Sequence, residues 1–448
     1  MTAPVMNAVI MDNPFTRVNK SAPFLIGDLS TLGLSFVPES LPHRESQIEN
    51  MVSLLESAVR GTKPSNIILF GKTGTGKTST ARHVTSLLSE AVEGKISVSY
   101  INCQIYDSPY SILITIAQSI NIRADPIPPL GWPLDRVYNE ILRRIRESNK
   151  DLIIILDEID KLTQKNGGDS LYVLLKLCED QVNPFVSVIG ITNNNTFIQE
   201  LDARVRSRLS QESIVFNPYN ASELRDILTF RIKGVVKEEC IDPSVINLCA
   251  AIGAQEHGDA RKALDLLRIS IETAIREKSE KVRESHVLKA RAKLETDVLR
   301  ETVAGLPLHS KLVLLGVIVS REMENTQAFS GEIMENYRNI CKELGFTPLT
   351  SRRFGDLISD LGESGLVITK MKNLGRHGRT RLITVADNPE VIKERLLEDD
   401  NLRAFRGIHL GKQARFAPYG DDSKPTASEQ EEIDDILDAR PDRSTDEK

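Results

Sequence analysis

The sequence predicts an α/β fold with a parallel, doubly wound sheet and a nucleoside triphosphate site, followed by a helical domain and a winged helix-turn-helix. Three observations support this prediction. A glycine-rich motif, GKTGTGKT at residues 71–78, follows a short apolar run. A second apolar run ends in Asp157 and Glu158, and a basic hairpin follows three helical segments near the C-terminus. The first two patterns are typical of phosphate and magnesium binding, and the third of DNA binding.

Length and composition indicate a globular protein of several domains. The chain has 448 residues, of which 40% are hydrophobic and 27% charged, so we expect two to four domains. No apolar stretch approaches the roughly 18 residues of a membrane span, and the N-terminus lacks the pattern of an export signal. The five cysteines include no Cys-x-x-Cys pair, which favours free thiols over disulfides or zinc ligands. We therefore expect a cytoplasmic, nucleoid-associated protein without a membrane partner.

The charge of the chain is unevenly distributed. The net charge is −6, but residues 421–448 alone hold eleven acids and four bases. Residues 364–386 carry five bases and no acid, namely Lys370, Lys372, Arg376, Arg379 and Arg381. A local basic patch in a balanced chain indicates that nucleic acid binds at one defined surface.

The glycine-rich motif is predicted to bind phosphate. An apolar strand is expected at residues 67–70 and a helix from about Lys77. Glycines let backbone N–H groups close around an anion, and the helix N-terminus adds a favourable dipole. Lys77 should reach the β- and γ-phosphates, while Thr78 should hold Mg²⁺. The predicted contacts of this loop with ATP or ADP are Gly71, Lys72, Thr73, Gly74, Thr75, Gly76, Lys77, Thr78 and Ser79.

The second motif, DLIIILDEID at residues 151–160, is predicted to complete the catalytic centre. Five consecutive apolar residues form a buried strand, whose end delivers Asp157 to the Mg²⁺ ion and Glu158 to an attacking water. The alternative is a core strand with a solvated acidic turn, and it is disfavoured once both motifs are counted.

Apolar runs that alternate with helical patterns divide the chain into domains. Strands are expected at residues 67–70, 96–101, 152–156, 186–191 and 213–216. The helical domain shows no good strand, and the acidic tail has the composition of a disordered segment. The predicted segments are an N-terminal arm (1–60), the nucleotide-binding domain (61–216), a helical domain (217–300), a winged-helix domain (301–395) and an acidic tail (396–448).

The winged-helix domain is predicted from three helices and a hairpin. The helices are expected at 308–321, 330–344 and 351–361, and the strands at 366–370 and 381–385. The third helix would enter the major groove of DNA, and the wing would follow the minor groove. A charge run is often only a solvated face, but its place at a hairpin tip favours DNA contact. The predicted DNA contacts are Thr350, Ser351, Arg352, Arg353, Arg376 and Arg379.

Read in order, these segments resemble the archaeal family of origin recognition complex and cell-division-cycle replication initiators, which are AAA+ ATPases. The resemblance rests on FVPESLPHRE at residues 36–45, NNN at 193–195, LDARVRSRL at 201–209, GDARKAL at 258–264 and the basic wing. It implies an AAA+ P-loop domain with a parallel sheet, a helical lid at 217–300 and a C-terminal winged helix. It also implies that part of the arm at 1–60 contacts adenine and that about 104–133 forms a helical insertion.

The resemblance also implies roles for particular residues. Asn193 would orient the attacking water, although Asn194 and Asn195 leave the choice of amide open. Arg208 would act as an arginine finger in a neighbouring subunit, with Arg204 and Arg206 as alternatives. Arg261 would sense the γ-phosphate from the lid. The remaining nucleotide contacts that it implies are Tyr219 and Arg231, together with four residues of the adenine pocket that act mainly through backbone and aliphatic contacts, namely Val37, Pro42, His43 and Arg44.

The function that the resemblance implies is ATP-dependent replication initiation. Such a protein binds double-stranded origin DNA, acts with other initiator subunits or copies of itself, and recruits or loads the replicative minichromosome maintenance helicase. Slow ATP hydrolysis would serve as a switch. One alternative is a clamp-loader-like remodelling ATPase, although clamp loaders lack a basic winged domain. The residues alone leave a second alternative open, an ATP-gated winged-helix transcription regulator.

Overall fold

The computed structural model describes most of the chain between residues 24 and 405 and divides it into two compact units. The units are Met1–Leu294 and Glu295–Lys448. The first contains an α/β domain and a helical domain, and the second contains the winged-helix domain. The described residues are 24–33, 36, 38–120, 126–128, 131–166, 168–181, 183–209, 212–324, 328–373, 379–386 and 388–405.

The α/β domain is built on one parallel sheet of five strands, as the sequence predicts. Their order is β2-β3-β4-β1-β5, so β1 lies beside β4 and not beside its neighbour in sequence. The carboxyl ends of β1, β3 and β4 therefore meet at one edge of the sheet, where three motifs are brought together. The strands are β1 (Ile67–Gly71), β2 (Ile96–Asn102), β3 (Asp151–Asp157), β4 (Val186–Thr192) and β5 (Glu212–Phe216).

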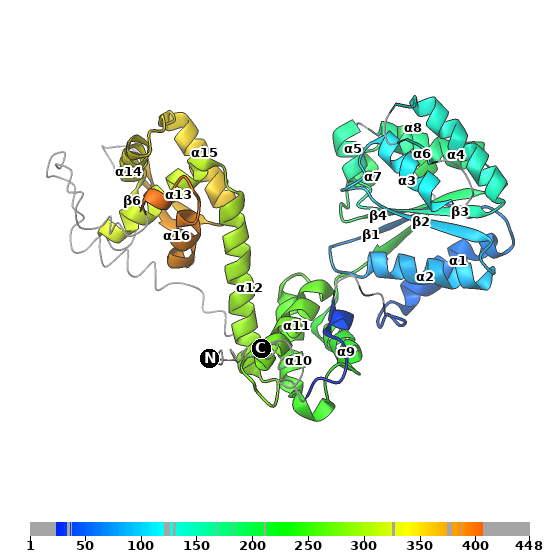
Figure 1. Ribbon diagram of the computed structural model, residues 1–448, viewed down its shortest axis with the longest axis horizontal. Helices are drawn as coiled ribbons and strands as arrows, with labels where there is room; N and C mark the ends of the chain where they lie inside the picture. The colour runs from blue at the N-terminus through cyan, green and yellow to red at the C-terminus, as the bar shows by residue number, and fades with distance from the viewer. Residues whose placement is uncertain are drawn as a thin grey trace, which may run out of the picture. The chain divides into compact units, whose positions relative to one another are not determined.

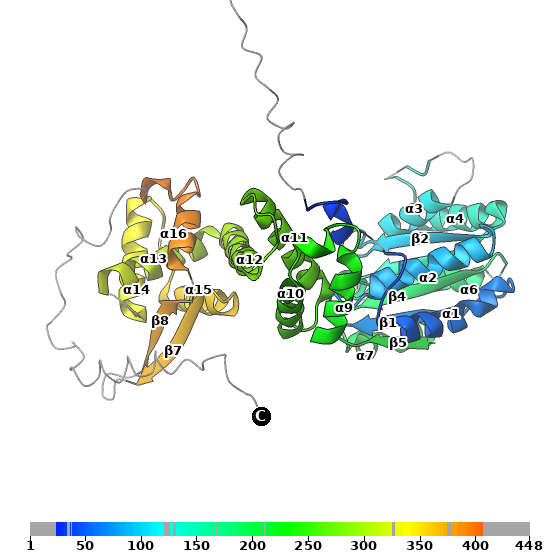
Figure 2. The same cartoon turned by 90° about the horizontal axis from the view of Figure 1, so that it is seen from below.

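Alternation along the strands places a separate hydrophobic core on each face of the sheet. In β1, Ile67 and Leu69 pack against α1 and α2, whereas Ile68 packs against the helices on the opposite face. Figure 1 shows the two helical layers above and below the sheet, and Figure 2 shows the sheet from another direction. The helices are α1 (Glu45–Val59) and α2 (Lys77–Ala91) on one face, with α3 (Pro109–Ser119), α4 (Leu134–Ser148), α5 (Lys161–Asn166), α6 (Asp169–Asp180), α7 (Phe197–Glu200) and α8 (Ala203–Leu209) in the other part of the domain.

The predicted insertion at about 104–133 contains α3, which belongs to the core of the domain. Ser108 and Ser111 form a reciprocal capping box at its start. Ile112 and Ile116 are fully buried against the sheet. Trp132 packs partly buried on the same core, and the Arg136 guanidinium lies 3.9 Å from its ring centre. This tryptophan therefore contributes to packing.

The helical domain follows β5 directly and includes part of the N-terminal segment. Leu25 forms an antiparallel bridge with Val236, and Leu32 is fully buried in the helical core. A short 3₁₀ helix, Leu29–Leu32, is capped by Asp28. Part of the predicted arm is thus lid structure. The lid helices are α9 (Ala221–Ile232), α10 (Pro243–Gln255), α11 (Ala260–Arg276) and α12 (Glu284–Gly305), with a 3₁₀ turn at Glu238–Cys240.

The second unit has the predicted three helices and hairpin, with one additional short strand. Its sheet is antiparallel with the order β6-β8-β7. Tyr337 lies in the core, where its hydroxyl accepts a 3.0 Å hydrogen bond from the backbone of Leu349. The elements are α13 (Leu308–Glu324), β6 (Ala328–Phe329), α14 (Ser330–Glu343), α15 (Ser351–Glu363), β7 (Val367–Asn373), β8 (Arg379–Val385), α16 (Pro389–Leu397) and a 3₁₀ turn at Arg403–Phe405.

In the ranges that the structure describes, every helix is too short or too polar to cross a membrane. All five cysteines are free thiols, and four of them are buried while Cys240 is partly exposed.

Candidate nucleotide site and nucleic-acid interface

The glycine-rich loop has the backbone that its sequence predicts. Gly71, Gly74 and Gly76 have φ values of 153°, 73° and 88°, and Gly76 caps the N-terminus of α2. Side chains are strained at such φ values, and there is also no space for them. A Cβ atom at Gly74 would lie 1.7 Å from the Asp259 carboxylate of the lid. The phosphate loop is therefore in close contact with the helical domain.

Lys77 is buried at the start of α2 and is held by the loop itself. Its ammonium donates to the carbonyls of Gly71 at 2.8 Å and Lys72 at 2.7 Å. Gly71 and Lys72 thus contact Lys77 and do not line the cavity. The loop residues from Thr73 onward do line it. Burial lowers the pKa of Lys77 to about 8, although Asp157 opposes the shift.

Asp157 stands at the end of β3, opposite the start of α2. Its Oδ2 accepts a hydrogen bond from the Thr78 hydroxyl at 2.8 Å and one from the Tyr100 hydroxyl at 2.8 Å. Its Oδ1 accepts from the backbone of Glu158 at 3.0 Å. The hydroxyl of Thr78 and the carboxylate of Asp157 are hard oxygen donors of the kind that Mg²⁺ prefers, and they converge on one point. The pair therefore fits the predicted Mg²⁺ site.

Glu158 and Asn193 both line the cavity, at the ends of neighbouring strands β3 and β4. The neighbouring Asn194 is engaged in its own turn, because its side chain accepts from the Thr196 backbone at 2.8 Å. The backbone of Asn194 donates to the Thr192 hydroxyl at 3.0 Å. These contacts favour Asn193 as the amide that faces the site.

The lid closes the phosphate end of the cavity through the start of α11. Arg261 lines the cavity, and its backbone donates to the capping carboxylate of Asp259 at 2.8 Å. The backbone of Ala260 donates to the carbonyl of Gly74 at 3.2 Å. The predicted γ-phosphate sensor thus lies within one residue of a direct contact between lid and phosphate loop.

The other end of the cavity is largely apolar and suits a purine base. Arg231 lines this end, with its guanidinium 5.0 Å from the Phe36 ring centre and Nε donating to the Thr31 carbonyl at 3.1 Å. Burial lowers the pKa of Arg231. The other apolar and aromatic residues that line the cavity include Pro38, Leu41, Pro42, Ile191, Tyr219, Ile227, Phe230 and Leu264.

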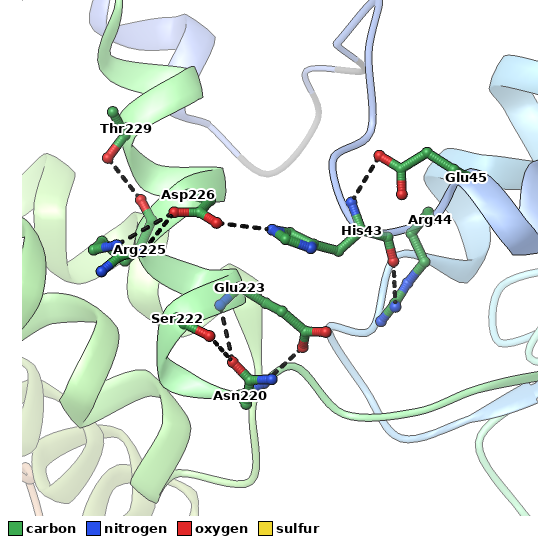
Figure 3. A network of polar contacts seen from close by, with 9 residues as sticks. All are labelled: His43, Arg44, Glu45, Asn220, Ser222, Glu223, Arg225, Asp226 and Thr229. Atoms are coloured by element: carbon green, nitrogen blue, oxygen red, sulfur yellow. Dashed lines mark hydrogen bonds and ion pairs between the residues drawn. The ribbon is translucent and has the colours of Figure 1, made fainter.

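Two predicted adenine contacts differ from expectation, since His43 and Arg44 do not line this cavity. The imidazole of His43 extends to α9, where Nε2 lies 3.1 Å from the Asp226 carboxylate (Figure 3). The side chain of Arg44 is 4% exposed and binds backbone carbonyls. His43 has a positive φ of 64°, and the two side chains after this turn contact α9 and the phosphate loop, respectively. Val37 lies outside the described residues.

The three candidate finger arginines lie on or near α8, apart from the cavity of their own chain. Arg208 forms a 2.7 Å ion pair with Glu179 of α6 and is 31% exposed. Arg204 pairs with Asp202, and Arg206 is exposed. None of the three lines the cavity, so any of them would have to act on the site of another chain.

Several residues of the site carry no motif and were missed by reading the sequence. Tyr100 and Arg82 lie beside Asp157, with the guanidinium 3.8 Å from the Tyr100 ring centre. Burial, with help from Asp157, raises the pKa of Tyr100 to about 12. The only available signal was register: β2 pairs with β3, which places Tyr100 two residues before the partner of Asp157. Asp259 belongs to the GDARKAL motif, but its place as the cap of α11 beside Gly74 was not predicted.

The winged-helix domain presents a basic surface around the start of α15. The Thr350 hydroxyl accepts from the backbone of Arg353, which caps the helix. Buried apolar residues occupy one face of α15, so Ser351 and Arg352 are exposed, and Arg353 pairs loosely with Asp356 at 3.6 Å. Arg381 of β8 donates to Ser359 of α15 at 3.3 Å, so the basic strand adjoins the helix. Arg376 and the side chain of Arg379 lie outside the described residues.

Three family models match the chain in the order of its domains. Residues 40–189 match an AAA ATPase domain. Residues 225–292 match the Cdc6 AAA+ ATPase-type lid domain. Residues 301–395 match the CDC6 C-terminal winged helix domain.

Relatives and solved structures agree with these matches over nearly the whole chain. The ORC1-type DNA replication protein 2 of Thermoplasma acidophilum is 54% identical over 406 residues, covering 91% of this chain and all of the relative. The ORC1-type DNA replication protein 1 of Archaeoglobus fulgidus is 43% identical, covering 88% and 97%. The structure of the Aeropyrum pernix ORC1 protein in complex with DNA is 38% identical with a TM-score of 0.71, covering 84% of this chain and 98% of that one.

Proposed function

Because the chain belongs to the archaeal ORC1/Cdc6 family of AAA+ replication initiators, we propose that it binds double-stranded origin DNA and uses ATP as the signal that prepares the origin for the replicative helicase. The observation that carries this proposal is the presence of a nucleotide site and a candidate DNA-binding surface in one chain. A phosphate loop in contact with a helical lid precedes a winged-helix domain whose third helix exposes arginine.

The nucleotide ligands that the cavity suits are ATP and ADP with Mg²⁺. Lys77 would hold the β- and γ-phosphates, and the N-terminus of α2 would stabilise their charge. Thr78 and Asp157 would hold Mg²⁺, which neutralises phosphate charge when bound. Glu158 would accept a proton from the attacking water, which Asn193 orients. Arg261 would report the γ-phosphate to the lid.

The positions of the candidate finger arginines support slow hydrolysis. Arg208 is outside its own cavity and paired with Glu179. An arginine finger contributes about 10³-fold or more to phosphoryl transfer. A single chain would therefore hold ATP for long periods and hydrolyse it only beside another initiator subunit or a second copy. Such timing suits a switch better than a motor.

The partners we propose are origin DNA, other initiator subunits or copies of this chain, and the minichromosome maintenance helicase. The DNA contacts would come from Thr350, Ser351, Arg352 and Arg353 in the major groove and from Arg376 and Arg379 in the minor groove. The helicase would bind the ATP-bound form, because lid position changes the surface presented to it.

The test is mapping of the protein on the chromosome in cells, combined with helicase mapping. We expect peaks at replication origins, with helicase peaks at the same positions that disappear in a Lys77→Ala strain. Peaks confined to promoters would instead support an ATP-gated transcription regulator. Origin peaks with helicase occupancy unaffected by Lys77→Ala would reject the role of ATP in loading.

A further inference from the structure

Arg44 is a buried arginine whose guanidinium is held by carbonyl oxygens and an aromatic ring. Nε donates to Thr75 at 2.9 Å, one terminal nitrogen donates to His43 at 2.9 Å, and the other donates to Asn217 at 2.7 Å. The Tyr219 ring centre lies 3.8 Å from the guanidinium carbon. Among the ion pairs within the described residues, none includes Arg44. Burial accordingly lowers the pKa of this arginine.

These partners belong to two functional parts of the molecule. Thr75 is the fully buried centre of the phosphate loop. Asn217 directly follows β5, and Tyr219 precedes α9, so both belong to the short connection between sheet and lid. The Tyr219 hydroxyl also packs against the loop, since a Cβ at Gly76 would lie 2.8 Å from it. One guanidinium therefore joins the loop to the connection between sheet and lid.

The residue before Arg44 extends the same link onto the lid itself. His43 meets Asp226 of α9, while its carbonyl accepts from Arg44 (Figure 3). The start of α9 is fixed by a capping box between Asn220 and Glu223, so its first turn is rigid. A displacement of Arg44 would thus reach the rigid first turn of α9 through His43.

We propose that Arg44 is a positioning residue that couples the phosphate loop to the lid connection. Phosphate binding turns N–H groups of the loop toward the anion, which shifts the carbonyls on the opposite side of the same peptides. Thr75 presents such a carbonyl to Arg44. The guanidinium is planar with donors in fixed directions, so a shift at Thr75 moves Asn217 as well. This route is separate from Arg261 and rests on the nucleotide binding proposed above.

Hydrogen exchange with and without saturating Mg²⁺-ATP tests this coupling in the full-length chain. In the wild type, we expect ATP to slow exchange both in the phosphate loop with the start of α2 and in residues 217–224. In Arg44→Lys, which keeps the charge but cannot reach all three carbonyls, the loop should still be protected. The ATP-induced slowing at residues 217–224 should fall at least fivefold. Arg276→Lys, at an exposed arginine at the end of lid helix α11 and away from these contacts, is the matched control and should behave as the wild type.

A second variant keeps the test valid if Arg44→Lys folds poorly. Arg44→Gln removes the buried charge, and its amide can donate to at most two of the three carbonyls, so it should also separate loop protection from protection of the connection. Full protection of residues 217–224 in Arg44→Lys would overturn the proposal. Loss of loop protection in Arg44→Lys at every ATP concentration would also overturn it, because Arg44 would then act within the loop alone. A wild-type chain without any loop protection would instead reject nucleotide binding, and with it the proposed function.

Discussion

Tyr100 donates a 2.8 Å hydrogen bond to Oδ2 of Asp157, the oxygen that also accepts from the Thr78 hydroxyl. The tyrosine comes from β2, one strand away from the carboxylate. Two hydroxyls on one oxygen, with a backbone N–H on the other, fix the rotation of the carboxylate. The proposed Mg²⁺ ligand is thus held in one orientation by three groups.

Tyr100→Phe should weaken Mg²⁺ binding without changing metal-free ATP binding. Loss of one hydrogen bond to a charged group costs roughly 1.5 kcal/mol, so the Mg²⁺ concentration for half-maximal ATPase activity should rise about tenfold. Metal titrations of ATPase activity and nucleotide binding in EDTA measure the two effects. Tyr106→Phe, at an exposed tyrosine after the same strand, is the control. An unchanged Mg²⁺ requirement would show that Thr78 and the backbone suffice to orient Asp157.

ATP affinity should fall as pH rises through about 8. The pKa of Lys77 is lowered from 10.5 to about 8 by burial, so its ammonium loses its proton in this range. The free energy of unfolding changes in the opposite direction. Below pH 8 the folded chain bears the cost of the buried charge, and this cost disappears as pH rises from about 8 to 10.5, so the folded state becomes more stable. Calorimetric titration with ATP from pH 7 to 9 should show affinity falling by up to tenfold per unit above pH 8. In Lys77→Arg, which stays charged, a pH-independent affinity is expected, and an equal decline there would assign the effect to another group.

Two inactive variants should restore ATPase activity when mixed. Lys77→Ala lacks a nucleotide site but retains Arg208, whereas Arg208→Ala retains the site and lacks the finger. In a mixed assembly on DNA, the first chain supplies the arginine to the second. Phosphate release from the mixture should exceed the sum of the separate rates at least tenfold. Arg204→Ala is the control and should hydrolyse ATP as the wild type does. Wild-type activity in Arg208→Ala would show that Arg208 is not the arginine finger. The same mixing test with Arg206→Ala would then test Arg206 as the finger.

Arg352→Ala should weaken DNA binding and lower its salt dependence. Each phosphate contact that is lost reduces the slope of log affinity against log salt concentration by about one. Fluorescence anisotropy with duplex DNA at several salt concentrations gives this slope. Arg403→Ala, an exposed arginine at the end of the same unit, should leave it unchanged. Equal slopes in the wild type and Arg352→Ala would place the DNA surface away from the start of α15.

Local patterns accounted for much of the fold. The five strands lie within one residue of their predicted ranges, because each is rich in apolar and β-branched residues, either in a continuous run as in β3 or with interspersed serines as in β2. The helix after the phosphate loop begins at Lys77 as expected. The two-residue strand β6 was missed because it is too short to show a pattern. Helix α12 continues to Gly305, past the expected domain limit at 300, since no helix-breaking residue stands there.

Contacts between distant segments could not be predicted in the same way. The family resemblance implied that Arg44 lines the adenine pocket, mainly through backbone and aliphatic contacts, but a motif does not give the partners of a side chain. Its three acceptors come from residues 31 and 173 positions away and from its own neighbour. Tyr100 needed the strand order, which places β2 beside β3 and not beside β1. Composition and spacing give neither the partners of a side chain nor the order of strands in a sheet.

Glu158 has a φ of 55°, a left-handed conformation that costs a glutamate roughly 1 kcal/mol or more. Glycine adopts the same backbone freely, so Glu158→Gly should raise the melting temperature of the chain while removing the base proposed for hydrolysis. A laboratory selection for heat resistance alone would therefore drift toward glycine here. It would enrich stable chains that bind ATP and do not hydrolyse it. Any stabilised form of this protein must therefore be screened for ATP turnover as well as for folding.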